Sequence, residues 1–169
     1  MKSKVIIEGW FDFENIYDLA VDIFDNCAFL EIGTYKGKSV AYLMSKIRDR
    51  KKNITVCVVD IFKPEYEKEF LNNMKELGFS PWIFKGKSSE VSHQFKDGQF
   101  AMIYIDAAHD YESVKSDLNN YYPKLKDGGI FAGHDYFEPC GVKQAVDEFA
   151  INNNLKLEIR GSSWLCSSY

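Results

Sequence analysis

Acidic and histidine side chains follow two apolar runs in the second half of the sequence. Asp106 comes directly after residues 100–105, and the pair His134-Asp135 follows residues 130–132 after one glycine. Two carboxylates and one imidazole around a single opening can bind a divalent cation, Mg²⁺ or Mn²⁺, and leave positions for substrate oxygens. Because Mg²⁺ prefers oxygen ligands, an imidazole ligand favours Mn²⁺ or Fe²⁺ over Mg²⁺, the alternative being that His134 is not a ligand. These three residues are candidate metal ligands, and the alternative is that they serve only as caps and hydrogen-bond partners.

A second histidine is a candidate general base. His109 follows Asp106 by three residues and comes just before Asp110, which can cap the next helix. An imidazole titrates near neutral pH and can accept a proton from a hydroxyl group at little cost. We therefore expect His109 and Asp106 in a catalytic centre, the alternative being that His109 bonds only within its own loop. His93, on a short polar helix away from any strand end, is expected to be a surface residue.

A glycine-containing turn indicates a nucleotide-sized pocket. Residues 29–39 (FLEIGTYKGKS) form an apolar run, a turn with two glycines and the start of a helix. We expect the backbone to turn sharply at Gly33 and a ligand to approach closely at Gly37, where a Cβ atom would obstruct it. Asp60 ends the apolar run 54–60, and a carboxylate there can accept both ribose hydroxyls. The pattern predicts a ligand that contains adenosine.

The elements that would position these residues alternate along the chain. Strands are predicted at residues 28–32, 54–60, 82–85, 100–105, 130–132, 155–159 and 163–167. Helices are predicted over about 13 residues after an Asp12 cap, over 37–49, from Pro64 to Gly78, over a short polar segment near residue 90, over 111–122 and over 142–151. Five β/α units followed by a hairpin around Gly161 imply an α/β fold, with a mostly parallel seven-stranded sheet and helices on both faces. Ligands bind such sheets beyond the carboxyl ends of the strands.

Size and composition restrict the class of protein. The chain has 169 residues, which predicts a single domain over residues 1–169. The net charge of −4 argues against a nucleic-acid partner. The four cysteines, which have no C-x-x-C spacing, are expected to be reduced in a cytoplasmic protein, and we expect neither a signal peptide nor a membrane partner.

In order and spacing, several motifs together resemble the class I S-adenosylmethionine-dependent methyltransferases. These motifs are residues 31–39 (EIGTYKGKS), 104–112 (YIDAAHDYE), 125–136 (LKDGGIFAGHDY) and 8–12 (EGWFD). The resemblance covers nearly the whole chain and is closest to the compact bacterial branch that includes sugar and antibiotic O-methyltransferases. It implies a Rossmann-like fold whose sheet ends in a C-terminal antiparallel hairpin.

The resemblance also implies roles for individual residues. Glu31 and Gly33 would line the methionine end of S-adenosylmethionine, and Asp60 would bind its ribose. The cofactor-binding residues expected on this basis are Glu31, Gly33, Tyr35, Gly37, Ser39, Asp60, Ile61, Ser88 and Asp106. Asp106, His134 and Asp135 would correspond to the metal ligands of catechol-type O-methyltransferases, which have a carboxylate and an amide in place of the last two residues.

We therefore expect methylation of an oxygen on a small hydroxylated molecule, such as a sugar, a catechol or a natural-product alcohol, with possible help from a cation. One alternative is a nicotinamide-dependent oxidoreductase, although the G-x-G-x-x-G fingerprint is absent and Tyr35 stands in place of its second glycine. Another is a non-catalytic methyltransferase-like binding module, since the sequence has no evident substrate lid. Candidates for that lid are residues 9–11, the neighbouring subunit of a homo-oligomer, or a larger assembly.

Overall fold

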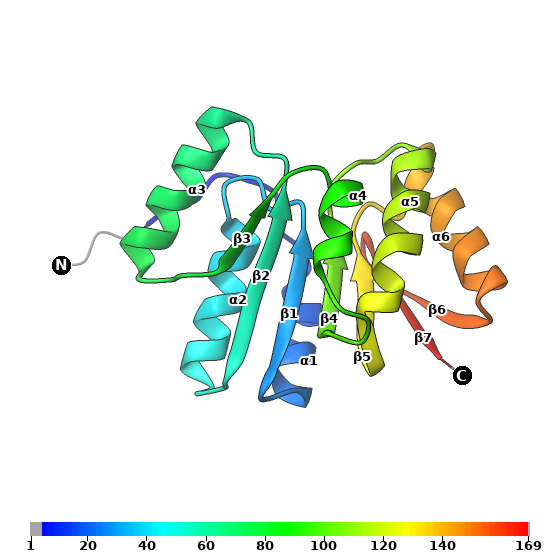
Figure 1. The fold of residues 1–169 in the computed structure, drawn as a ribbon, viewed down its shortest axis with the longest axis horizontal. Helices are drawn as coiled ribbons and strands as arrows, with labels where there is room; N and C mark the ends of the chain where they lie inside the picture. The colour runs from blue at the N-terminus through cyan, green and yellow to red at the C-terminus, as the bar shows by residue number, and fades with distance from the viewer. Residues whose placement is uncertain (1–4, 169) are drawn as a thin grey trace.

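The computed structural model describes residues 5–168 and contains a seven-stranded sheet in the order β3-β2-β1-β4-β5-β7-β6 (Figure 1). The strands are β1 (Cys27–Ile32), β2 (Ile54–Asp60), β3 (Trp82–Lys85), β4 (Phe100–Ile105), β5 (Leu125–Gly133), β6 (Leu155–Arg160) and β7 (Ser163–Ser168). The first five strands run parallel, whereas β7 is antiparallel to both β5 and β6. This arrangement confirms the predicted fold, including the hairpin at the sheet edge.

Helices cover both faces of the sheet. They are α1 (Glu14–Ile23), α2 (Lys38–Asp49), α3 (Pro64–Leu77), α4 (Ser88–Val91), α5 (Tyr111–Tyr121) and α6 (Gly141–Asn152), with 3₁₀ turns η1 (Ser92–Gln94) and η2 (Tyr122–Lys124). Side chains of α1, α2 and α3 pack with one set of strand residues, and those of α4, α5 and α6 pack with the other set. Figure 1 shows α4 and α5 in front of the sheet and α1 and α2 behind it.

The strand sequences explain why two cores form. Successive residues of a strand point to opposite faces. In β1, Phe29 joins the core beneath α1 and α2, while Leu30 joins the core beneath α5 and α6. Val58 and Val59 of β2 divide in the same way. Strands that are apolar on both sides suit a parallel sheet buried between two helical layers.

The order of the strands creates a crevice beside β1. The chain proceeds outward from β1 to β2 and β3, and then returns to place β4 on the other side of β1. Helices that follow β1 and β4 therefore lie on opposite faces, and their first residues separate at the carboxyl ends of these two strands. In open α/β sheets this topological switch point is where ligands bind.

Two local predictions were wrong. Helix α1 begins at Glu14, Phe13 occupies the N-cap position and no side chain caps the helix. Asp12 is therefore not a cap, because its carboxylate bonds to His134 and Ser162 instead. Strand β5 begins at Leu125, before the two glycines at 128 and 129 that were expected to precede it. The register between β4 and β5 shifts there, and such a bulge accommodates extra residues within a strand.

Within the described part of the chain, no helix combines the length and the apolar character needed to cross a membrane.

Candidate functional site

A cavity of about 750 Å³ lies at the carboxyl ends of β1, β2 and β4. This volume lies in the range of small-molecule and cofactor sites. Among the residues expected to bind the cofactor, the following line the cavity: Gly33, Tyr35, Ser39, Asp60, Ile61, Ser88 and Asp106. Glu31 and Gly37 do not line it. The turn after β1 and the tips of β2 and β4 therefore meet at one site.

Gly33 allows the backbones of β1 and β4 to approach closely. Its φ is 82°, and its N–H donates a 2.8 Å hydrogen bond to the carbonyl of Val59. A Cβ atom at this position would lie 2.0 Å from the carbonyl oxygen of Asp106. Glycine is required here for the turn and for this backbone contact, which brings Asp106 to the cavity wall.

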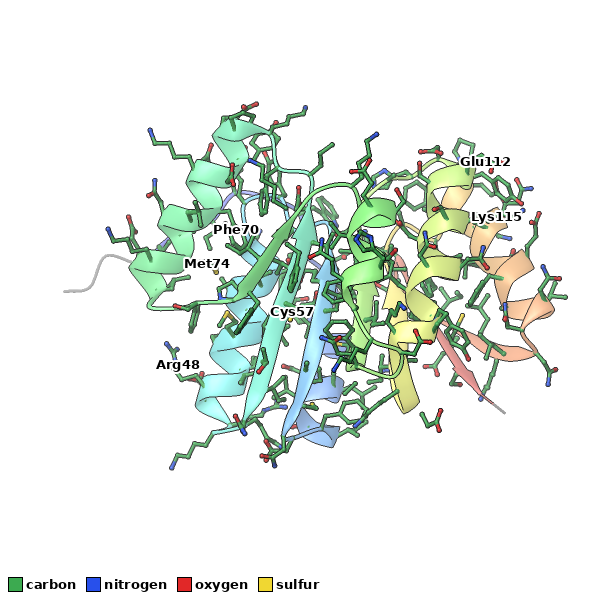
Figure 2. All side chains as sticks on the ribbon, viewed as in Figure 1. Arg48, Cys57, Phe70, Met74, Glu112 and Lys115 are labelled. Carbon is green, nitrogen blue, oxygen red and sulfur yellow. The ribbon has the colours of Figure 1, made fainter. Side chains whose placement is uncertain are left out.

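Gly37 has a different function from the one expected. It adopts a left-handed conformation at the N-cap of α2, and a Cβ atom there would lie 2.7 Å from the ring of Phe70. Figure 2 shows Phe70 and Met74 on the side of α3 that faces the rest of the molecule. The close neighbour of Gly37 is thus α3 rather than a ligand. A glycine pattern by itself does not distinguish these two causes.

Glu31 lies beneath the cavity and is buried. It is 1% exposed, and its carboxylate accepts hydrogen bonds from the hydroxyls of Tyr17 at 2.5 Å and Ser39 at 2.6 Å. Burial is the main cause that raises the pKa of Glu31 to about 7, and the two hydroxyls partly oppose it. Because Ser39 lines the cavity, Glu31 is one hydrogen bond away from any ligand at that end.

Asp60 connects the tip of β2 to the turn after β1. Its Oδ2 accepts hydrogen bonds from the N–H groups of Thr34 at 2.7 Å and Tyr35 at 3.1 Å. Its Oδ1 accepts one from the N–H of Phe62 at 2.7 Å. An ionised carboxylate has about four acceptor positions, so roughly one remains for a ligand hydroxyl group.

The N-terminal segment forms part of the cavity wall. Glu8, Gly9 and Trp10 line the cavity, and Trp10 is largely exposed. The Nζ of Lys38 donates to the carbonyl of Gly9 at 2.7 Å, and the Nζ of Lys36 lies 2.6 Å from a carboxylate oxygen of Glu8. Lys36 in the turn after β1 and Lys38 at the start of α2 thus hold this segment in place.

The opposite end of the cavity contains Ser88 and a residue that was not identified from the sequence, Asp117. The Ser88 hydroxyl donates to Oδ1 of Asp117, and the Tyr121 hydroxyl donates to the Ser88 carbonyl at 2.8 Å. A signal was available, because Asp117 falls between Val114 and Leu118 on the buried face of α5. An acidic residue at a core position of a helix is unusual and indicates a specific partner.

Asp106, His134 and Asp135 form a cluster beside the cavity. One ligand atom from each lies within 4.8 Å of the others. His134 is 7% exposed, with its Nδ1 3.2 Å from Oδ1 of Asp135 and 4.0 Å from Oδ1 of Asp106. On the other side of the ring, Nε2–H donates to Asp12 at 2.8 Å and lies 2.8 Å from the hydroxyl of Ser162.

The charges in this cluster influence one another. Burial raises the pKa of Asp106 to about 6, although His134 acts in the opposite direction. Burial alone would lower the pKa of His134, but the carboxylates of Asp106, Asp12 and Asp135 outweigh burial and raise it. The geometry and charge of the cluster suit a cation between Nδ1 and the two nearer carboxylates.

His109 joins this cluster from the loop after β4. Its Nε2 lies 2.9 Å from Oδ2 of Asp135, and its side chain is 57% exposed. His109 is therefore accessible to a molecule at the mouth of the site, and it is not confined to contacts within its own loop. Sequence reasoning placed these residues together because they end neighbouring parallel strands. It missed Asp12 and Ser162, which arrive from opposite ends of the chain.

The sequence profile of a family described as a methyltransferase domain, Methyltransf_24, matches residues 30–136. The match covers more than half of the chain. It includes the turn after β1, the tips of β2 and β4, and the His134-Asp135 pair. The chain belongs to this methyltransferase family. As a member of it, the protein is an S-adenosylmethionine-dependent methyltransferase, which excludes the oxidoreductase alternative.

The methyltransferase shares its fold with solved structures at low sequence identity. The SAH-bound Podospora anserina methyltransferase PaMTH1 is 16% identical, with a TM-score of 0.73 over 92% of this chain and 77% of that one. The O-methyltransferase NovP is 18% identical, with a TM-score of 0.69 over 92% and 78% of the two chains. The precorrin-6y C5,15-methyltransferase of Geobacter metallireducens is 11% identical, with a TM-score of 0.71 over 90% and 84%. None of the curated proteins compared with the methyltransferase matches it significantly in sequence.

Proposed function

We propose that this methyltransferase transfers the methyl group of S-adenosylmethionine to an oxygen of a small hydroxylated molecule, assisted by a divalent cation. One observation carries the proposal: His109 lies 2.9 Å from Asp135, so a base and a set of cation ligands share one carboxylate at the edge of the cofactor cavity. The presence of an O-methyltransferase among the solved structures of the same fold is consistent with it.

The cofactor would lie along the cavity with its ribose at Asp60, its methionine end near Ser39 and its adenine near Ser88. The remaining acceptor position of Asp60 supports the first of these placements. The Ser39 hydroxyl donates to buried Glu31, so its oxygen faces the cavity as an acceptor for the ammonium group. This orientation would place the methyl group toward Asp106, which lines the cavity and is also a member of the adjoining cluster.

Asp106, His134 and Asp135 would hold the cation. The hydrogen bond from Nε2 of His134 to Asp12 leaves the Nδ1 lone pair directed toward the other two ligands, an arrangement common around protein metal sites. When bound, a cation would lower the pKa of the acceptor hydroxyl and fix the position of its oxygen.

His109 would accept the proton of the acceptor hydroxyl. As the acceptor oxygen bonds to the methyl carbon, the bond between carbon and sulfur breaks, and its electron pair stays on sulfur to give S-adenosylhomocysteine. Asp135 orients the imidazole and stabilises the imidazolium that forms. The chain's main contribution is alignment, because the sulfonium methyl group is already activated.

The experiment is a methyl-transfer screen of sugars, catechols and polyketide-like alcohols, with labelled cofactor and with EDTA, Mg²⁺ or Mn²⁺. We expect turnover with a hydroxylated acceptor that is stimulated by Mn²⁺. His109→Ala should lower kcat by about 10²-fold to 10⁴-fold, the usual contribution of general acid–base catalysis. His93→Ala is the matched control, because His93 is exposed on η1 and does not line the cavity. Equal turnover in the two variants would refute the role of His109, and EDTA-resistant turnover would refute that of the cation.

A further inference from the structure

The adenine end of the cavity contains a carboxylate that the proposed chemistry does not use. Asp117 is 3% exposed and lines the cavity from α5. Its Oδ1 accepts a hydrogen bond from Ser88, whereas its Oδ2 has no hydrogen-bond partner among residues 5–168. Oδ2 is not fully enclosed by protein atoms, so it can accept a hydrogen bond from a ligand in the cavity.

The surroundings of Asp117 restrict which group a ligand can present there. The only proton of the Ser88 hydroxyl is used in the bond to Asp117, so Ser88 Oγ can offer a ligand only its lone pairs. The Tyr121 hydroxyl holds the Ser88 carbonyl in place, which prevents this serine from turning away. Two neighbouring acceptors, Asp117 Oδ2 and Ser88 Oγ, therefore require a donor from the ligand.

The charge of Asp117 supports this requirement. Burial raises the pKa of Asp117 to about 6, and the negative charge of Asp110 acts in the same direction. The carboxylate is thus mostly ionised at neutral pH and accepts hydrogen bonds without donating any. An exocyclic amino group, with two N–H donors, satisfies it. A carbonyl oxygen at the same place would face another acceptor.

We propose that Asp117 is a specificity-determining residue that selects adenine over hypoxanthine by accepting a hydrogen bond from the exocyclic amino group. The inference rests on the proposed placement of S-adenosylmethionine in this cavity, and it adds the residue that distinguishes this base from one with a carbonyl group at the same position.

The test compares the binding of S-adenosylhomocysteine and S-inosylhomocysteine by calorimetry. The inosine compound replaces the amino group with a carbonyl oxygen and carries a hydrogen on the adjacent ring nitrogen N1, and the rest of the molecule is the same. For the wild-type protein we expect the adenine compound to bind about 10-fold to 100-fold more tightly, the range for a hydrogen bond to a charged group. Asp117→Asn should reduce or reverse this ratio, because the amide can keep its oxygen toward Ser88 and turn its NH₂ group to the ligand.

Asp110→Asn is the matched control. It makes the same chemical change on the same helix, at an exposed carboxylate that caps α5 through the N–H of Ser113 and does not line the cavity. This variant should keep the wild-type preference for adenine. A merely structural role of Asp117 would weaken both ligands equally in Asp117→Asn and leave their ratio unchanged.

The outcomes separate this inference from the proposed function. If wild-type protein binds neither compound, the placement of the cofactor and the role of Asp117 both fail. If it binds both compounds equally, the role of Asp117 alone is overturned, and this measurement does not depend on whether any variant folds. An affinity ratio of the two compounds that is equal in wild-type and Asp117→Asn protein also overturns the role of Asp117. A preference for the adenine compound that is lost only in Asp117→Asn supports this role.

Discussion

Replacement of Glu31 by Gln should make the free energy of unfolding less dependent on pH. Burial raises the pKa of the Glu31 carboxyl from 4.5 to about 7, so the folded state binds its proton more tightly than the unfolded chain does. For a raised acid pKa, stability is highest below pH 4.5 and falls as pH rises toward 7. At about 1.4 kcal/mol per pKa unit, the cost of ionising Glu31 reaches about 3 kcal/mol. A glutamine cannot ionise and avoids this cost.

Urea or thermal unfolding at pH 5 and pH 8 would measure the effect. Between these values the stability of Glu31→Gln relative to wild type should rise by about 2 to 3 kcal/mol, or roughly 5 to 10 °C in Tm for a chain of this size. The glutamine can still bond to Tyr17 and Ser39, because each hydroxyl can either donate or accept. A stability difference that is the same at both pH values would refute the assignment of a raised pKa to Glu31.

Two further substitutions test the architecture of the site. Gly33→Ala should destabilise the protein by at least about 3 kcal/mol in urea unfolding, because the new Cβ atom would lie 2.0 Å from a backbone oxygen and φ is positive. Unfolding of this variant at the wild-type urea midpoint would contradict the contact. Asp12→Ala should weaken Mn²⁺ binding about 10-fold to 100-fold by calorimetry, because the outer partner of His134 is lost. Affinity for S-adenosylhomocysteine should stay unchanged, and intact Mn²⁺ binding would show that Asp12 does not support the cation site.

The sequence predicted well what short-range patterns determine. The apolar runs located the strands, and the turn after β1 placed Gly33 and Asp60 at one cavity. Prediction from the sequence failed where tertiary contacts override local preference. Asp12 has the form of a helix cap, but its strongest partner, His134, lies far along the chain. Gly37 is required by the ring of Phe70, which local sequence does not reveal.

Asp117 illustrates a different limit of prediction from the sequence. Its position on α5 follows the helical period of the core residues, and this pattern by itself indicates only a face that packs in the interior. Only the structure shows that the buried face of α5 also borders the cavity. An acidic residue inside an apolar helix face is a signal that sequence reasoning can use, provided that each exception to the pattern is examined.

The contact between Asp12 and Ser162 has a consequence for synthesis of the protein. These residues are separated by 150 positions, and both touch His134. Contacts over such separations form late, because a long segment must first be ordered. A nascent chain still missing its last hairpin would therefore hold an incomplete histidine environment. Assembly of this corner should be among the final events of folding, after the parallel strands have already formed.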